Sequence, residues 1–210
     1  MIRLLCLAIG YLFGLFQTSY ILGRVHGIDI REYGSHNAGT TNMLRTMGLK
    51  AGLLTFAGDC SKCILAVVLV RVIFGKTHAD ILPLLEFYAA AGTILGHNYP
   101  FYLKFKGGKG IAVLAGLVLS TKLWMVPIPL AAFIFVVAVT RYVSAGSLLV
   151  TIIFLAEVIC FGQRGGICDG AALCVRIISG DVFTDGTGMV EASCKYKETV
   201  EWNREQNRVF

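Results

Sequence analysis

The chain has 210 residues, of which 56% are hydrophobic and only 15% are charged, and its formal net charge is +6. A soluble domain averages about 25% charged residues, so this apolar content is too high for an ordinary soluble domain. The basic residues lie in short loops between apolar runs and form no stripe interleaved with aromatic residues. This pattern argues against nucleic acid as a partner and favours membrane lipids.

Six apolar runs follow one another along the chain. A helix that crosses a bilayer needs about 20 apolar residues. The runs cover residues 2–23, 51–74, 80–100, 111–121, 123–140 and 143–162, and the fourth is short. The first run lacks an A-x-A-like cleavage site and is too long for a signal peptide, so we expect it to be a span. The sequence therefore predicts an all-α protein, a polytopic membrane bundle with six spans.

The loops between the runs differ in charge. Residues 24–50 and 101–110 carry seven basic residues: Arg24, Arg31, Arg45, Lys50, Lys104, Lys106 and Lys109. The other turns hold one basic residue each. Because cytoplasmic loops are enriched in Lys and Arg, we expect both basic loops in the cytoplasm and the N-terminus outside.

The first basic loop contains the string GSHNAGTTNMLR, from Gly34 to Arg45. Its glycines allow close backbone approach, and its Ser, Asn and Thr side chains supply neutral donors and acceptors. Arg45 offers a planar fork suited to phosphate. The alternative is a solvated turn followed by a helix cap, because this is ordinary loop composition.

The second basic region reads GHNYP at residues 96–100 and KFKGGKG at residues 104–110. Glycines around Lys109 at the start of a helix predict an anion nest, in which backbone N–H groups and an ammonium face one ligand. The spacing of a Walker A loop is absent. The alternative is a basic loop that only sets topology.

Charged residues also occur inside the second run. Asp59 and Lys62 lie three residues apart on one helix face. Because charges in a membrane are costly, we expect both to face the bundle interior and either to pair or to support a site. Cys60 and Cys63 form a CxxC without a second pair at zinc spacing, so we expect no metal. Together with the two loops, these charges predict a site for a small anionic substrate, which leaves a lipid enzyme and an anion transporter open.

Three strings resemble one enzyme family. GSHNAGTTNMLRTMG and GHNYPFYLKFKGGKGIA resemble the first and second signatures of the PlsY-type acyl-phosphate:glycerol-3-phosphate acyltransferases. GDCSKCILAV resembles the segment between them, and the likeness runs from about Gly10 to Gly146. The resemblance implies a multi-pass enzyme of the bacterial plasma (inner) membrane with seven helices and cytoplasmic signature loops. It also implies acyl phosphate and glycerol-3-phosphate as substrates, lysophosphatidic acid as product, and no cofactor.

The resemblance also implies site residues. The first signature places Ser35, Asn37, Thr41, Asn42 and Arg45 in the site, and the second places His97, Lys104, Gly107, Gly108, Lys109 and Gly110 there. We expect Arg45 and Lys104 to bind glycerol-3-phosphate, and the glycine-rich loop with Lys109 to bind acyl phosphate. Ser35 and His97 are the expected catalytic residues. His97 is a candidate base, although a departing phosphate oxygen could serve instead.

Two positions depart from the family pattern. His36 and Cys63 each stand where the family usually has glycine. His36 bears on the tight turn of the first loop, and Cys63 bears on helix packing.

The end of the chain departs more strongly. The family ends with a seventh helix and a third signature, and neither is visible in residues 160–210. When the codons are read one base later, the text from Lys195 onward can encode much of that signature, and Trp202 then forces a glycine. We therefore predict an acyltransferase domain at 1–159 and a frameshifted tail at 160–210. An inactive copy of the enzyme is the resulting alternative.

Overall fold

The computed structural model describes residues 1–121, 125–140 and 142–161, and every regular element in these ranges is a helix. The elements are α1 (Ile2–Gly14), α2 (Thr18–Val25), η1 (Ile30–Glu32), α3 (Thr40–Met47), α4 (Leu49–Phe74), α5 (Leu82–Asn98), η2 (Phe101–Leu103), α6 (Ile111–Thr121), α7 (Pro127–Thr140) and α8 (Val143–Phe161). The all-α prediction is confirmed. The predicted tail lies almost wholly outside the described residues.

Within the described ranges, two stretches are long and apolar enough to cross a bilayer, Ile2–Val25 and Leu49–Phe74. Shorter apolar helices occupy Ile111–Ser120, Pro127–Thr140 and Ala145–Val158. The predicted count of six spans is therefore not confirmed by helix length. The fourth run forms an 11-residue helix, in agreement with its expected shortness.

The first predicted span is broken near its end. α1 stops at Gly14, and Gln17 adopts an extended conformation before α2 begins at Thr18. The Gln17 amide is buried and donates to the carbonyl of Gly14 at 3.3 Å and to that of His97 at 2.9 Å. The side chain thereby donates hydrogen bonds to carbonyls at the ends of two helices. These last carbonyls have no backbone N–H partner within their own helix.

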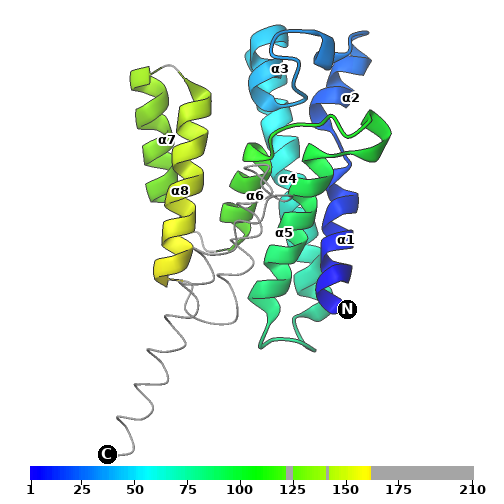
Figure 1. Cartoon of the computed structure of the whole chain (residues 1–210), viewed down its shortest axis with the longest axis vertical. Coiled ribbons are helices and arrows are strands. Elements are labelled where there is room, and N and C mark those ends of the chain that lie inside the picture. The colour runs from blue at the N-terminus through cyan, green and yellow to red at the C-terminus, as the bar shows by residue number, and fades with distance from the viewer. Residues whose placement is uncertain (122–124, 141, 162–210) are drawn as a thin grey trace, which may run out of the picture.

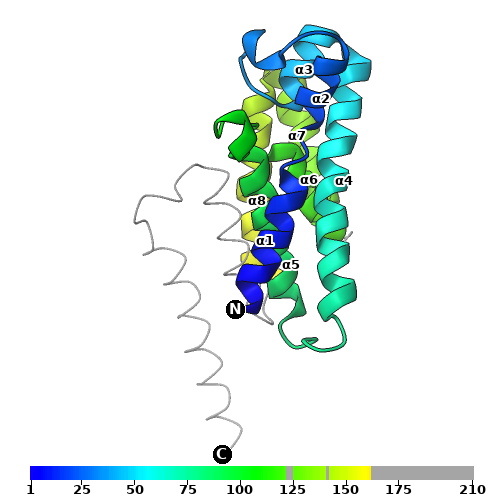
Figure 2. The same cartoon turned by 90° about the vertical axis from the view of Figure 1, so that its right-hand side faces the viewer.

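Small residues bring α1 against α5 (Figures 1 and 2). A Cβ added at Gly10 would overlap the carbonyl of Ala89, and one added at Gly92 would overlap the carbonyl of Leu7. Glycines at such positions let helix backbones touch. α4 meets α6 in the same way, since a Cβ added at Gly116 would lie only 3.0 Å from the Cβ of Cys63. Cys63 is fully buried in the resulting core, so the family's glycine is replaced here by a residue that still fits.

Both basic loops lie at one end of the bundle, and the N-terminus lies at the other (Figure 1). Arg31 links the loops by donating to the carbonyl of Leu103 at 3.3 Å. The α7–α8 hairpin stands beside the other helices, and its Phe154 stacks on Phe87 of α5 with ring centroids 6.4 Å apart. The loop end of the bundle therefore faces the end of the hairpin where α7 ends and α8 begins (Figure 1).

Candidate active site

A cavity of about 370 Å³ lies between the first basic loop, the start of α6 and the α7–α8 hairpin. Nine of the predicted site residues line it: Ser35, Asn37, Thr41, Asn42, Arg45, Asp59, His97, Lys109 and Gly110. The exposed side chains of Arg45 and Lys109 have no carboxylate partner among the described residues. The cavity therefore has two cations available for an anionic ligand.

Part of the cavity lining forms an apolar wall. It is formed by Phe56, Ile111, Ala112, Phe133 and Leu148. These side chains come from α4, α6, α7 and α8, and the hairpin contributes Phe133 and Leu148. One cavity thus presents a charged rim and an apolar wall, which suits a ligand that is itself an anion with a hydrocarbon chain.

Asn42 shapes the first basic loop from inside. Its Oδ1 accepts from the amide of Ser35 at 2.8 Å, and its Nδ2 donates to the carbonyls of Ile30 at 2.9 Å and Tyr33 at 3.0 Å. These three bonds occupy its amide. Asn42 therefore positions Ser35 at the cavity, whereas the sequence had suggested only that it binds substrate.

His36 occupies the left-handed region, with φ of 56°. Non-glycine residues pay roughly 1–2 kcal/mol there, which explains why glycine suits this turn. The His36 ring lies with its Nδ1 3.0 Å from the carbonyl of Arg31, a contact that supports the turn when Nδ1 carries the proton. The tight turn expected of the first loop is kept.

His97 is 2% exposed and lies at the inner end of the cavity. Its Nδ1 is 2.8 Å from Nζ of Lys62 and 3.8 Å from Oδ1 of Asp59. Lys62 and Asp59 form an ion pair of 2.9 Å, with exposed fractions of 4% and 1%. The prediction that both intramembrane charges face the bundle interior is confirmed, and the contact with His97 connects them to the cavity.

The glycine-rich loop crosses the end of α5. The amides of Gly107 and Gly108 donate to the carbonyls of Asn98 and His97, each at 3.0 Å. A Cβ at Gly107 would overlap the His97 carbonyl, and one at Gly108 would overlap the His97 ring. These two amides cap α5, so they are not part of the predicted anion nest. The nest is left with Lys109, Gly110 and the first amides of α6, which have no acceptor within their own helix.

Lys104 follows η2 with φ of 57°, and its side chain is exposed. It is not among the residues that line the cavity. The structure therefore does not bring Lys104 and Arg45 together, and the role of Lys104 in binding glycerol-3-phosphate stays a prediction.

Asp29 forms ion pairs with two arginines of the first basic loop, next to η1. Asp29 accepts from the guanidinium of Arg31 at 2.7 Å and from that of Arg24 at 3.2 Å. The hydrogen bond from Arg31 is the main cause that lowers the pKa of Asp29 to about 2. The Asp29 carboxylate is therefore charged throughout the physiological range.

Thr40 is a cavity residue that the sequence argument did not single out. Its Oγ1 is buried and has no hydrogen-bond partner within the described part of the chain, and Thr40 lines the cavity at the start of α3. The signal was present, because Thr40 precedes Thr41 in the first signature. The apolar wall gave no such signal, because lipid-facing and cavity-facing apolar residues look alike in a sequence.

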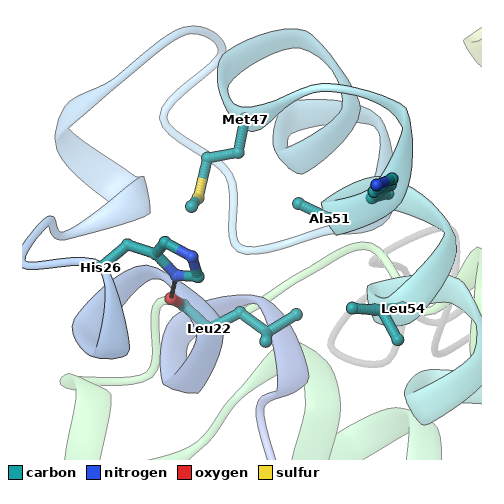
Figure 3. A pocket seen from close by; sticks show the side chains of 6 residues that line it. Leu22, His26, Met47, Ala51 and Leu54 are labelled. Carbon is teal, nitrogen blue, oxygen red and sulfur yellow. Dashed lines mark hydrogen bonds between the residues drawn. The ribbon is translucent and has the colours of Figure 1, made fainter.

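A second cavity of about 300 Å³ lies between α2, α3 and α4 (Figure 3). It is lined by Leu22, His26, Met47, Lys50, Ala51 and Leu54. In Figure 3 the His26 ring bonds to the carbonyl of Leu22, at 2.8 Å. None of the predicted site residues lines this cavity. Within the described ranges, no group of three or more His, Cys, Asp or Glu residues could hold a metal ion.

Comparison with known proteins fits this arrangement. A family model described as "Glycerol-3-phosphate acyltransferase" matches residues 4–183. The chain belongs to the glycerol-3-phosphate acyltransferase family. The family's acyltransferase from Clostridioides difficile is 44% identical over 140 residues, which are 66% of this chain and 68% of that protein. That from Geobacter sulfurreducens is 37% identical over 181 residues, or 84% and 87%.

Two solved structures share the fold. One is the glycerol 3-phosphate form of PlsY, an integral membrane glycerol 3-phosphate acyltransferase, with a TM-score of 0.75 and 26% identity over 85% of this chain and 86% of that one. The other is the lysphosphatidic acid form, with a TM-score of 0.73 and 24% identity over 98% and 92%. The family assignment from the signature strings is confirmed, and the fold is that of an integral membrane acyltransferase.

Proposed function

We propose that this chain transfers the acyl group of an acyl phosphate to glycerol-3-phosphate and forms lysophosphatidic acid. A glycerol hydroxyl oxygen attacks the acyl carbonyl carbon, the bond from that carbon to the phosphate oxygen breaks, and inorganic phosphate leaves. The hydroxyl proton moves to the departing phosphate. The observation that carries the proposal is that one cavity combines an apolar wall with two exposed cations that have no carboxylate partner among the described residues.

The two halves of the cavity suit the two halves of the donor. Lys109 suits the phosphate oxygens of the donor, and the amides at the start of α6 add positive potential at the same place, while Arg45 suits the phosphate of glycerol-3-phosphate. The apolar wall with Phe56 and Phe133 suits the acyl chain. Ser35 lies at the rim and supplies a hydroxyl next to the reacting groups. Holding both substrates in one geometry accounts for much of the rate in such a reaction.

The same proposal places the chain in the bacterial plasma membrane as a multi-pass protein. The basic loops would face the cytoplasm and the N-terminus would face outside, as the distribution of Lys and Arg predicts. The location of both basic loops at one end of the bundle supports this orientation. Water-soluble glycerol-3-phosphate would reach the rim from the cytoplasm, and the acyl chain would lie at the level of the lipid.

The test is a donor comparison in lipid nanodiscs. The purified chain receives labelled glycerol-3-phosphate with acyl phosphate, acyl-CoA or acyl carrier protein carrying the same acyl group. We expect labelled lysophosphatidic acid from acyl phosphate alone, with one inorganic phosphate released for each product. Transfer from acyl-CoA at a comparable rate would refute the proposed donor.

A second candidate is an inactive copy of this enzyme, and the text of residues 160–210 favours it. The coding DNA tests the frameshift directly, because codons that cannot encode the third signature one base later would remove the idea. The anion-transporter alternative has no comparable support, since the chain belongs to an acyltransferase family.

A further inference from the structure

The contacts of Lys62 define the chemical state of His97. The Lys62 ammonium lies 2.8 Å from the carbonyl oxygen of Phe16, 2.9 Å from Oδ1 of Asp59 and 2.8 Å from Nδ1 of His97. An ammonium has three hydrogens to donate and cannot accept. Each of its three hydrogens therefore has one acceptor, and the carboxylate of Asp59 balances its charge.

The acceptor role of Nδ1 follows from this arrangement. A charged Lys62 can only donate to Nδ1, and that nitrogen then carries no proton. A neutral imidazole bears one proton, which must then be on Nε2. His97 in this state can donate a hydrogen bond through Nε2, but it has no free nitrogen with which to take a proton from a substrate.

The Nε2 edge of the ring has no hydrogen-bond partner among the described residues. A side chain at position 108 would cover this edge, because a Cβ on Gly108 would overlap Nε2. His97 is 2% exposed, whereas Arg45 and Lys109 are exposed, and all three line the cavity together with the apolar residues. A buried donor in a cavity lined by both cations and apolar residues suits the carbonyl that joins the phosphate of an acyl phosphate to its chain.

We propose that Lys62 fixes the His97 tautomer, so that Nε2–H donates to the acyl carbonyl oxygen as that oxygen becomes negatively charged. His97 then stabilises the oxyanion and is not the general base, and Lys62 is a positioning residue. When the hydroxyl oxygen adds to the carbonyl carbon, the C=O electron pair moves onto the oxygen facing Nε2–H. It returns when the bond to phosphate breaks, and the hydroxyl proton leaves with the phosphate. This inference rests on the proposed function.

The tautomer is measurable without turnover. The full chain is labelled with ¹⁵N-histidine in nanodiscs, and the His97 signals are identified by their loss in His97→Gln. We expect a protonated Nε2 and an unprotonated Nδ1 in the unsubstituted chain. Lys62→Met should change this state, because Nδ1 loses its donor while Asp59 remains close. The exposed Ser61→Ala, one residue away on α4, should leave it unchanged. A protonated Nδ1 in the unsubstituted chain would overturn the proposal.

The role is measured by turnover. Glutamine can place an N–H near the position of Nε2 but cannot serve as a base, whereas alanine does neither. Removing one oxyanion donor costs about 10²–10³-fold in kcat, so we expect that loss in His97→Ala and a loss within about tenfold in His97→Gln. KM for glycerol-3-phosphate should change little. Equal losses in both variants would mean that an N–H at this position does not support the reaction, and would overturn the proposal. No transfer at all by the unsubstituted chain would instead count against the proposed function, and the tautomer measurement would still stand.

Discussion

Replacing Asp59 by asparagine should destabilise the fold strongly, because it leaves the Lys62 charge buried without its counter-ion. The Lys62 side chain is 4% exposed, so water cannot solvate the ammonium. Breaking a buried pair by removing one partner costs about 3–5 kcal/mol. Lys62 keeps two acceptors, on Phe16 and His97, so we expect the lower end of this range, about 3 kcal/mol.

A loss of about 3 kcal/mol lowers the folding equilibrium constant more than a hundredfold. Equilibrium unfolding of the full chain in mixed micelles, followed by circular dichroism, measures it. The double variant Asp59→Asn with Lys62→Met removes both charges, and we expect it to recover much of the loss. Ser61→Ala serves as the control on α4 and should stay within about 0.5 kcal/mol of the unsubstituted chain.

Two results would refute this reasoning. One is a loss below about 1 kcal/mol in Asp59→Asn, which would mean that water or another group compensates Lys62. The other is a double variant as unstable as the sum of the two single variants, which would mean that the two charges do not act on each other.

Gly92→Leu should separate α1 from α5 and cost about 1–3 kcal/mol or more in unfolding free energy, whereas the exposed Leu12→Val should cost little; an unchanged Gly92 variant would contradict the observed contact. Arg45→Lys keeps the charge but loses the planar fork, so we expect KM for glycerol-3-phosphate to rise about tenfold with a smaller change in kcat; an unchanged KM in steady-state assays would remove Arg45 from that phosphate. The pKa of Asp29 is lowered from 3.8 to about 2, mainly by the Arg31 hydrogen bond, so its stabilising effect is present above pH 4 and is lost as the pH falls towards 2. Asp29→Asn should cost roughly 1 kcal/mol at pH 7, since both arginines are partly exposed, and should flatten the unfolding free energy between pH 4 and pH 2; a slope equal to that of the unsubstituted chain would contradict this.

Local patterns in the sequence predicted the features that depend on few residues. The cost of burying charge placed Asp59 and Lys62 in the interior, and they lie there. The resemblance identified His36 as an unusual residue in a turn that favours glycine, and its φ of 56° agrees. The short fourth run became a short helix because too few apolar residues separate Gly110 from the next turn.

Features that depend on the approach of distant segments were not predicted. The break between α1 and α2 occurs within an apolar run, and Gln17 makes sense there only once the end of α5 lies beside it. Likewise, the amides of Gly107 and Gly108 looked available to an anion until the carbonyls of α5 were found beneath them. Neither partner is visible in the local sequence.

The contact between Lys62 and His97 was missed for the same reason. The two residues are 35 positions apart and belong to different helices, and no local pattern pairs them. The sequence therefore identified His97 as a candidate base, whereas the contacts favour a hydrogen-bond donor.

The central claim is that the cavity beside the first basic loop transfers an acyl group from acyl phosphate to glycerol-3-phosphate. The most direct measurement is the formation of labelled lysophosphatidic acid in nanodiscs by this chain, by a version whose tail is restored to the other reading frame, and by Arg45→Ala in the restored version. We predict transfer by the restored version, loss of that transfer in Arg45→Ala, and lower but measurable transfer by the chain with its present tail. A restored version that folds but makes no lysophosphatidic acid from acyl phosphate would contradict the account.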